Sequence, residues 1–527
     1  MSIKLPDLDI DPTLGAAIRH RAATTPDTDF LVSEDDRWSY GQIEAASARV
    51  ARRMLAKGIG KGTRVGLYFT YGPEWVICWL AASRIGALVI PLSTIYAPLE
   101  LGRVLKLSDI SVLIAPATLL SRSVSDAFET ALPGLAAADG PDLRLAEAPF
   151  LRQIWMTDAA DRPWAEHFDL TAEPAATDPD AALLAAVEEE VVSSDPAVVV
   201  FTSGSSALPK GVVHTHGSII YQSSMLPGLM QARSGDLPAK IICGMPFFWV
   251  GGILTLAGSM LGPIPLMIME RFDPVTAMTL IEREKATVLM GWPTLQQKIV
   301  NHPDFDRFDL SSAPSITSGI DTAMTNIPVP GVPVHRGMSE TLGSFACVET
   351  KVIDPDTGDT VAWGEDGELC VRGPGVMDAY YKKPRSEAFD ADGWFHSGDK
   401  VFQLEGDPRS FYRGRYTEMI KTSGANVAPR EVEAAIEEFE DVVHCLVFGV
   451  PDEDQGEAVL AVVAQKSGAR PDKADMTRRA RLTLSGYKVP KHWVFVSEET
   501  IPWLGSGKAD KLRLRAMLPE LTGRSAA

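Results

Sequence analysis

Short, almost continuously apolar runs alternate with amphipathic stretches through residues 30–350, and this alternation restricts the fold more than any other feature of the chain. The runs include Val65–Phe69, Ala87–Pro91, Val112–Ala115 and Val288–Met290. Strands that are apolar on both faces and are separated by helices indicate parallel sheets that helices cover on both sides. We therefore expect an α/β fold for this part of the chain.

A change of texture after this region predicts two further parts. Residues 350–412 combine short strands with Gly, Pro and Asp turns, which indicates a smaller β-rich subdomain. An amphipathic helix (Pro429–Glu438) and two later strands predict a small α+β module near the C-terminus. The 527 residues also exceed the roughly 250–300 that one core usually supports. We expect a large N-terminal domain over residues 1–414 and a small C-terminal domain over residues 415–527.

Two segments depart from the alternation. Residues 130–195 are rich in Ala, Asp, Glu and Pro, which favours a surface excursion. Ile241–Met269 carries no charged side chain and is long enough to span a membrane, but several glycines and prolines interrupt it. This pattern favours a buried strand–helix–strand unit, with strands at Ile241–Gly244 and Leu266–Met269 and a helix over about Ile253–Leu261.

The composition excludes some classes of protein. A net charge of −19 argues against a general nucleic-acid or anionic-membrane surface, but it permits a nucleotide site, which needs only local positive potential. The five cysteines show no Cys-x-x-Cys spacing, so we expect a reducing compartment without a disulfide framework or structural zinc. The termini show no apolar signal core and no targeting tail. These features predict a cytoplasmic protein without a transmembrane segment.

Residues 200–211 contain the first candidate site. An apolar run (Ala197–Phe201) leads directly into a turn of small hydroxyls, a glycine and a lysine, namely Thr202, Ser203, Gly204, Ser205, Ser206 and Lys210. Backbone N–H groups and hydroxyls can approach phosphate oxygens closely, and the ammonium supplies charge. The turn lacks the Gly-Lys-Ser/Thr of a Walker A loop. By itself it fits a phosphate site or an ordinary strand followed by a Ser/Gly loop.

Further short motifs follow in a fixed order. They are Pro246-Phe-Phe-Trp-Val-Gly-Gly, Arg336-Gly-Met-Ser-Glu-Thr, Gly367-Glu-Leu-Cys-Val-Arg-Gly-Pro, Asp392-Gly-Trp-Phe-His-Ser-Gly-Asp399, the stretch from Arg413 to Glu433, and Pro502-Trp-Leu-Gly-Ser-Gly-Lys508. In this order, over about residues 20–515, the chain resembles the adenylate-forming superfamily of acyl-CoA synthetases, nonribosomal-peptide adenylation domains and beetle luciferases. The resemblance implies two half-reactions, in which a carboxylate displaces pyrophosphate from ATP and a thiol then displaces AMP. Both need positioning and charge neutralisation more than covalent catalysis.

The resemblance implies roles for residues around ATP. The hydroxyls of the 202–206 turn and Lys210 would hold the β- and γ-phosphates, and Ser339 would meet the α-phosphate. Glu340 would bind Mg²⁺, for which a carboxylate oxygen is a suitable ligand; alone, it would fit a helix-start carboxylate after a Ser339 cap. Asp399 would bind the ribose hydroxyls, although it also fits a turn. Arg415 would hold ribose or phosphate oxygens. Taken alone, it would fit an ordinary surface arginine.

The C-terminal motifs imply a moving domain. Lys508 would bring its ammonium to the reacting carboxylate and α-phosphate, whereas as an isolated residue it would be a solvated lysine. A hinge at Thr417 would let this domain alternate between two poses. In the second pose the loop at Ser423 and Gly424 would line the CoA tunnel. The implied co-substrates are therefore ATP with Mg²⁺ and CoA.

The sequence departs from the family pattern at several positions. Ala207 stands where a glycine is usual, and its methyl group could narrow a position that needs φ > 0. Arg336 occupies the adenine-stacking position, usually Tyr, where a guanidinium can also stack. Trp249 replaces a frequent His, Thr417 a frequent Asp or Lys, and Lys511 a frequent Arg. None of these changes removes a charge essential to the reaction.

The segments that would line the acyl pocket are apolar or aromatic and predict a hydrophobic acid: fatty, alicyclic, aromatic or sterol-derived. The pocket residues expected from the resemblance are Phe248, Trp249, Gly251, Trp292, Ser318, Gly319 and Thr341. The leading hypothesis is an AMP-forming carboxylate–CoA ligase, and family members are often homodimers. Two alternatives are an enzyme that loads a carrier protein and a nucleotide- or acyl-binding homologue that has lost catalysis.

Overall fold

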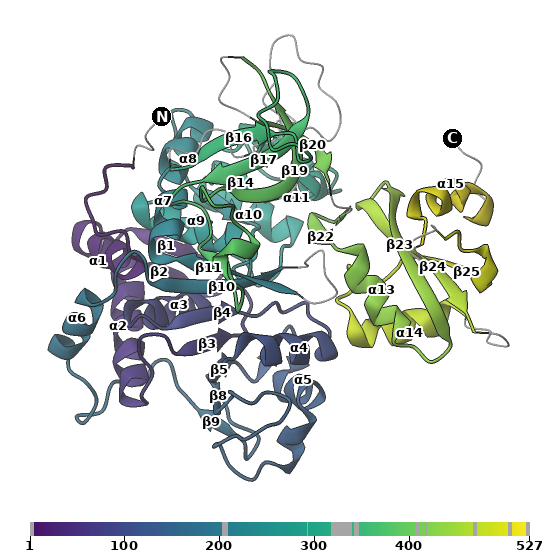
Figure 1. The fold of residues 1–527 in the computed structure, drawn as a ribbon. Coiled ribbons are helices and arrows are strands. Elements are labelled where there is room, and N and C mark those ends of the chain that lie inside the picture. The colour runs from purple at the N-terminus through teal and green to yellow at the C-terminus, as the bar shows by residue number, and fades with distance from the viewer. Residues whose placement is uncertain are drawn as a thin grey trace. The chain divides into compact units, whose positions relative to one another are not determined.

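A computed structural model describes residues 5–202, 209–291, 293–317, 340–341, 347–405, 410–416, 419–466, 472–503 and 509–522. The chain divides into two compact units (Figure 1). The first contains residues 1–94, 105–200 and 211–416. The second contains residues 95–104, 201–210 and 417–527. The predicted domain boundary between residues 414 and 415 stays a prediction.

The first unit holds two sheets whose central strands are parallel. One has the order β14 (Val288–Met290), β12 (Ile241–Cys243), β13 (Leu266–Met267), β1 (Asp29–Val32), β2 (Arg37–Ser39). The other has the order β18 (Ala379–Tyr380), β11 (Lys210–Thr215), β10 (Pro196–Thr202), β4 (Leu88–Pro91), β3 (Arg64–Leu67), β5 (Val112–Ala115), β8 (Gln153–Met156), β9 (Ala165–His167). From β10 to β9 this sheet runs down Figure 1. Antiparallel edge strands, β2 and β18, make both sheets mixed, and the α/β prediction is confirmed.

Helices fill the space between and around these sheets. The shared core joins buried side chains of both sheets to Leu14, Tyr40, Trp75, Trp79 and Leu256, which come from helices. Several helices begin at a side-chain cap; α2, for example, starts at a capping box between Ser39 and Gln42. The helices of this unit are α1 (Leu14–Thr24), α2 (Tyr40–Ala56), α3 (Pro73–Arg84), α4 (Pro98–Ser108, shared with the second unit), α5 (Val124–Ala131), α6 (Ala181–Glu189), α7 (His216–Ser223), α8 (Leu226–Ser234), α9 (Val250–Leu261), α10 (Pro274–Glu284), α11 (Pro293–Val300) and α12 (Pro314–Thr317).

The prediction that residues 130–195 form only a surface excursion is wrong. This segment supplies β8 and β9, which extend the larger sheet by parallel pairing beyond β5. Trp155 and Phe168 are fully buried and their rings stack with centroids 4.5 Å apart. Two aromatic side chains therefore anchor a stretch whose overall composition resembles that of a loop, because a few large buried rings outweigh many small polar residues.

The uncharged segment at residues 241–269 forms the predicted strand–helix–strand unit. It contains β12, the buried helix α9 and the short strand β13, and both strands belong to the first sheet. Gly252 lies where α9 begins, and a Cβ there would lie 2.1 Å from the Pro246 carbonyl oxygen. The glycine is needed for close backbone approach at the turn into the helix. Among the described residues, no helix is both long and apolar enough to cross a membrane.

A third, antiparallel sheet forms the predicted β-rich part. Its order is β15 (Glu340–Thr341), β20 (Ser410–Arg415), β19 (Phe395–Gln403), β17 (Gly367–Arg372), β16 (Glu349–Ile353). Figure 1 shows these strands in green at the top of the first unit. Val352, Leu369, Val371 and Val401 form its small core. The antiparallel pairs β16–β17, β17–β19 and β19–β20 bring residues far apart in this region into one sheet.

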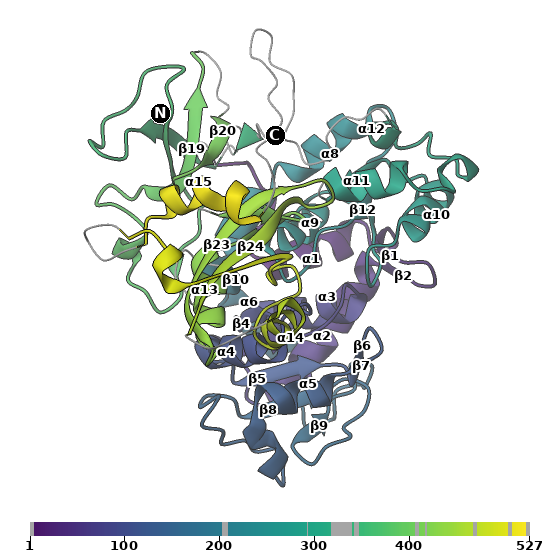
Figure 2. The same cartoon turned by 90° about the vertical axis from the view of Figure 1, so that its right-hand side faces the viewer.

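The second unit is built on a sheet that helices cover on both faces. Its order is β22 (Ala425–Val427), β21 (Ile420–Thr422), β24 (Gly456–Gln465), β23 (Val442–Asp452), with β25 (His492–Val496) parallel to β24. α13 (Pro429–Glu437) and α14 (Lys473–Thr483) pack with one set of buried strand residues, and α15 (Lys511–Thr522) packs with another. Figure 2 shows α15 lying across β23 and β24. The α+β prediction for this unit is confirmed.

A buried charge cluster lies inside the second unit. The Lys488 ammonium contacts Glu100 Oε1 and lies 2.7 Å from Glu431 Oε1, and each of the three side chains is at most 7% exposed. The Ser485 N–H donates to Glu100 Oε2 over 2.9 Å. Burial acts to lower the pKa of Lys488, but the charges of Glu100 and Glu431 raise it above its ordinary value. Lys488 is therefore a charged ammonium in a site that little water reaches.

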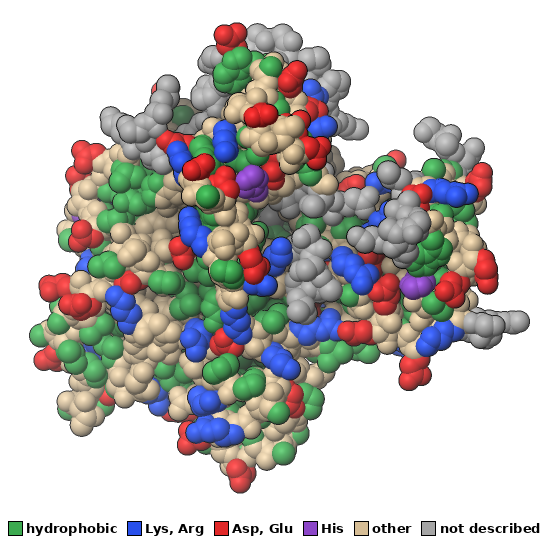
Figure 3. Space-filling view, viewed as in Figure 1, with side chains coloured by type: hydrophobic (Ala, Val, Ile, Leu, Met, Phe, Trp, Pro, Cys, Tyr) green, Lys and Arg blue, Asp and Glu red, His purple; other side chains and the backbone are tan. Residues whose placement is uncertain are grey.

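Acidic and basic side chains alternate over the face of the molecule that Figure 3 shows. Ion pairs elsewhere on the first unit include Arg37 with Glu284 at 2.8 Å and Lys285 with Asp309 at 2.8 Å. Such pairs contribute little each, because solvent screens them. On the face that Figure 3 shows, acidic side chains are interspersed with basic ones rather than gathered in one patch.

His214 makes the stability of the first unit depend on pH. It lies on β11 with 7% of its surface exposed, and burial lowers its pKa to about 4. The neutral ring is stable in the fold above the unfolded pKa near 6.5, so its contribution is lost as pH falls from about 6.5 through 4. We expect the unfolding free energy to drop by about 3 kcal/mol from this residue by pH 4.

Urea unfolding at pH 7 and pH 4 measures this effect. In the variant His214→Phe the ring is replaced by an apolar one of similar shape, and the loss between the two pH values should be smaller by about the same 3 kcal/mol. An equal loss in both proteins would show that His214 does not titrate in this range.

Candidate active site

Strands β10 and β11 hold the two ends of the predicted phosphate loop. Thr202 is the last residue of β10 and Lys210 the first of β11, and the Thr202 hydroxyl donates to the Lys210 carbonyl over 3.4 Å. Thr202 is exposed and Lys210 is half-buried. The remaining loop residues Ser203, Gly204, Ser205, Ser206 and Ala207 lie outside the described residues. β10 is parallel to β4, so the loop leaves the carboxyl end of a buried strand, the usual place of a ligand site in such sheets.

The antiparallel sheet gathers several other predicted ATP residues. Asp399 on β19 is the register partner of Arg415 on β20. The next strand pairs Glu340 on β15 with Phe411 on β20, and Thr341 with Ser410. Residues separated by up to 75 positions in the chain thereby share three adjacent strands of one sheet.

The backbone around Asp399 is held by its neighbours. The Asp399 N–H donates to Ser397 Oγ over 3.1 Å, and Ser397 Oγ donates to the Leu369 carbonyl over 2.7 Å. Gly398 has a φ of +72°, a conformation that favours glycine. Its N–H donates to Glu368 Oε1 over 2.9 Å. The half-buried Asp399 therefore sits on a tightly bonded turn within a strand.

An aromatic cluster surrounds the turn between β12 and α9. Phe248 is 4% exposed, and its ring meets Trp249 edge-on with centroids 5.6 Å apart. Tyr71 packs against Phe247 and Phe248, with centroid distances of 5.4 and 6.2 Å. Trp75 also contacts Phe247, at 5.4 Å. Of the predicted acyl residues, Phe248 and Trp249 thus lie together in a wall of packed rings.

Small residues beside this cluster leave little room for side chains. A Cβ on Gly251 would lie 2.3 Å from Met245 Cε. Cβ atoms on Gly244 and Gly291 would both meet Leu295 Cδ1, at 2.5 and 2.7 Å. These distances are too short for contact, so a larger residue at any of the three positions would force the neighbouring side chain to move.

The predicted CoA loop is a two-residue hairpin turn in the second unit. Thr422 pairs with Ala425, and the intervening Ser423 and Gly424 have φ values of +51° and +83°. Both are exposed, and the Ser423 N–H donates to the Gln455 carbonyl over 2.9 Å. Left-handed backbone at a non-glycine residue is costly and marks a constrained turn. The turn is thus held in place while its outer surface faces solvent.

Several predicted residues cannot be placed. Trp292, Ser318, Gly319, Arg336, Ser339, Thr417 and Lys508 lie outside the described residues, and Glu340, Thr341 and Arg415 are described by their backbone alone. Lys511, close after Lys508, contacts the buried carboxylate of Glu433 at 2.7 Å. This ion pair ties the start of α15 to α13. The roles that the sequence assigns to all these side chains stay predictions.

Sequence reasoning did not single out three residues that border these groups. Tyr71 and Trp75 follow the carboxyl end of β3, and their position after a parallel strand was an available signal. Glu368 stands inside a quoted motif but received no role, because its contacts depend on the pairing of β17 with β19. Only the strand register reveals the contacts of Glu368.

The fold is that of adenylate-forming enzymes. Residues 18–326 and 317–381 match the family model described as AMP-binding enzyme, and residues 431–508 match the AMP-binding enzyme C-terminal domain. The chain therefore belongs to the AMP-binding enzyme family, in its acyl-CoA synthetase and ligase branch. As a member of this branch it is an AMP-forming acid–thiol ligase that uses ATP and CoA.

Individual relatives match along nearly the whole chain. A putative acyl-CoA synthetase of Bacillus subtilis, YngI, is 29% identical, with 98% of this chain and 99% of the relative covered. A Mycobacterium tuberculosis ligase named for 3-[(3aS,4S,7aS)-7a-methyl-1,5-dioxo-octahydro-1H-inden-4-yl]propanoyl:CoA is 30% identical, with 96% and 99% covered. The amide bond synthetase McbA of Marinactinospora thermotolerans has a similar fold, with a TM-score of 0.73, 23% identity, and 95% and 99% coverage.

Proposed function

We propose that this ligase activates a hydrophobic carboxylic acid, with an alicyclic or aromatic acid as the first class to test. The observation that carries this proposal is the wall of packed rings formed by Tyr71, Phe247, Phe248 and Trp249 beside the turn into α9. Apolar and aromatic walls suit apolar ligands, and few polar groups are needed to orient them. The bicyclic propanoyl group in the name of the M. tuberculosis relative supports the same class.

The reaction proceeds in two steps, adenylation of the acid and formation of the thioester. A carboxylate oxygen attacks the α-phosphorus of ATP, the bond to the β-phosphate oxygen breaks, and pyrophosphate leaves an acyl-adenylate. The CoA thiolate then attacks the acyl carbon, AMP leaves with the electron pair of the broken bond, and a thioester forms. Charge builds on phosphate oxygens in the first step, so fixed cations and N–H groups around them lower the barrier.

We assign the ATP-binding roles to residues at the strand ends. The 202–206 turn and Lys210 hold the β- and γ-phosphates, and Ser339 meets the α-phosphate. Asp399 binds the ribose hydroxyls, and Arg415 binds ribose or phosphate oxygens. Their adjacent register on β19 and β20 supports a shared role, because neighbouring strands can present both side chains to one nucleotide. Arg336 stacks on the adenine.

Mg²⁺ is assigned to Glu340. An oxygen ligand suits this ion, and β15 places the residue in the same sheet as Asp399 and Arg415. An Mg²⁺ ion held by Glu340 would supply positive charge that neutralises part of the phosphate charge. Glu340 itself contributes one carboxylate to the ion.

Roles on the acyl and thiol side complete the proposal. Trp249 closes the acyl pocket toward CoA, and the exposed turn at Ser423 and Gly424 contacts the pantetheine arm in the second step. The remaining pocket residues are Gly251, Trp292, Ser318, Gly319 and Thr341. Thr417 serves as hinge and Lys508 as the catalytic lysine of the first step. A cytoplasmic location and a homodimer stay predictions.

A pyrophosphate-release screen tests the substrate class. The purified protein is given ATP, Mg²⁺ and single acids: acetate, straight-chain acids up to sixteen carbons, hydrindane and cyclohexane propanoates, benzoates, and a dicarboxylate. Each buried methylene is worth about 0.8 kcal/mol, or roughly fourfold in binding. We expect kcat/KM for the best ring-containing acid to exceed that for acetate at least tenfold.

Three results of this screen decide between the candidate functions. Adding CoA should give AMP and an acyl-CoA, whereas thioester formation only on a carrier protein would favour the carrier-loading alternative. A preference for acetate or the dicarboxylate would contradict the hydrophobic class. Failure to release or exchange pyrophosphate with any acid would favour the homologue that has lost catalysis.

A further inference from the structure

Strand β19 bulges at the position of Asp399. Glu368 on β17 pairs with Lys400, and Cys370 pairs with His396. Between these two pairs β17 advances by two residues and β19 by four, so Ser397, Gly398 and Asp399 lie on an expanded stretch. Bulges re-aim side chains and are frequent next to active sites. The register between β17 and β19 is therefore irregular over the stretch that carries Asp399, whereas Asp399 stays in register with Arg415 on β20.

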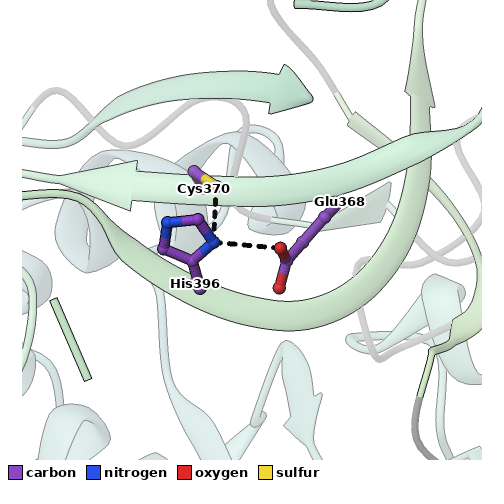
Figure 4. A group of neighbouring side chains, drawn as sticks. All are labelled: Glu368, Cys370 and His396. Carbon is purple, nitrogen blue, oxygen red and sulfur yellow. Dashed lines mark hydrogen bonds and ion pairs between the residues drawn. The ribbon is translucent and has the colours of Figure 1, made fainter. Parts of the chain in front are cut away.

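The Glu368 side chain contacts both ends of this expanded stretch of β19. Its Oε1 accepts the Gly398 N–H over 2.9 Å, and its Oε2 lies 3.0 Å from His396 Nδ1 (Figure 4). One carboxylate thus holds both ends of the three-residue segment that leads into Asp399. The Glu368 side chain is 12% exposed and its bond from the Gly398 N–H is partly buried, so this bond counts for more than a surface bond, whereas His396 is 39% exposed.

We propose that Glu368 is a positioning residue that fixes the 396–399 turn and so orients Asp399 toward the ribose of ATP. The inference rests on the proposed ribose contact of Asp399. Gly398 has left-handed backbone, and without an anchored N–H a glycine there has many other conformations available. Loss of that anchor would let Asp399 leave the geometry in which it accepts ribose hydroxyls, although its own carboxylate is untouched.

Glu368, Cys370 and His396 are also a combination of side chains that can hold a metal ion (Figure 4). Cys370 Sγ lies 3.7 Å from His396 Nδ1, and one ligand atom of each residue lies within 4.8 Å of the others. However, both Glu368 oxygens are already engaged, and burial together with the Glu368 charge raises the pKa of the Cys370 thiol to about 12. A zinc ion needs the thiolate, so the contacts favour the positioning role.

A role of Glu368 through its charge and a role through positioning predict opposite changes in the KM for ATP. If Glu368 acted only through its negative charge, its removal would lower the KM for ATP, because ATP is an anion. If it positions Asp399, removal raises that KM. We expect Glu368→Ala to raise the KM for ATP about tenfold and Glu368→Gln to raise it less, because the amide oxygen can still accept the Gly398 N–H. The KM values for the acid and for CoA should change less than twofold.

A nucleotide that lacks one ribose hydroxyl gives the sharper readout. Bonds to charged groups are worth about 1.5–3 kcal/mol, so wild type should use 3′-deoxy-ATP or 2′-deoxy-ATP roughly 10- to 100-fold less well than ATP. In Glu368→Ala this discrimination should fall to about threefold, since Asp399 no longer reads the hydroxyls. Glu349→Ala, which removes a 2.6 Å ion pair with Arg372 on the same sheet, should keep the wild-type ratio.

Variants of Asp399 and Glu368 together separate the proposed ribose contact from the proposed positioning role. If Asp399→Asn retains wild-type KM and discrimination, the ribose contact itself is wrong. If Asp399→Asn loses discrimination but both Glu368 variants keep it, Asp399 binds ribose without help and the positioning role is overturned. Circular dichroism and melting temperature check folding, and Glu368→Gln serves if the alanine variant does not fold. Sub-micromolar binding of one Zn²⁺ that Cys370→Ser abolishes would also overturn the proposal.

Discussion

Replacing Lys508 by alanine is expected to abolish acyl-adenylate formation and to spare thioester formation from a supplied acyl-adenylate. Negative charge grows on the carboxylate and the α-phosphate in the first step, and removing one such cationic or N–H donor costs about 10²–10³ in kcat. The second step expels AMP and does not need this ammonium in the same place. Pyrophosphate release measures the first step, and AMP formation from a synthetic acyl-adenylate and CoA measures the second.

A matched control is Lys473→Ala, which removes an exposed lysine from the start of α14. It should leave both half-reactions within a factor of two of wild type. Pyrophosphate release at the wild-type rate in Lys508→Ala would refute the assignment, and equal loss of both half-reactions would mean that Lys508 acts in folding or in both steps.

Replacing Lys488 by methionine is expected to destabilise the second unit by about 3–5 kcal/mol. The side chain keeps its length, but Glu100 and Glu431 then face each other without a cation in a site where no more than 7% of either side chain is exposed. Burial already raises the pKa of Glu431. Without Lys488 both carboxylates should take up protons more readily, so the loss of stability should be larger at pH 8 than at pH 5.

Hydrogen exchange of the β23 and β24 amides in increasing urea reports the stability of this unit separately from the rest. Lys491→Met is the control, since Lys491 pairs with Asp452 at 2.5 Å but is 44% exposed. Solvent screens such a pair, and its loss should cost less than about 1 kcal/mol. Equal effects of the two variants would show that the buried cluster contributes no more than a surface ion pair.

The sequence predicts the local elements of this protein well. Apolar runs between glycine and proline turns give β3, β4, β5, β10 and β14 close to the expected residues, because burial on both faces of a parallel strand leaves a clear signal. The segment at 241–269 also forms the expected unit. For residues 130–195 the prediction is wrong: the short buried run Ile154–Met156 and the Trp155–Phe168 stack lie in a segment whose overall composition resembles that of a loop.

The sequence by itself determines which chemistry the chain can supply: hydroxyls and a lysine after β10, carboxylates at 340 and 399, and lysines near the C-terminus. Only the tertiary structure decides which of these groups meet. The register of β19 with β20 puts Asp399 beside Arg415, and the bulge opposite β17 brings Glu368 beneath the Asp399 turn. Likewise, the buried ammonium of Lys488 is paired with the carboxylate of Glu100, which is 388 positions away in the chain. Such pairings depend on partners distant in the chain, whose contacts no local pattern encodes.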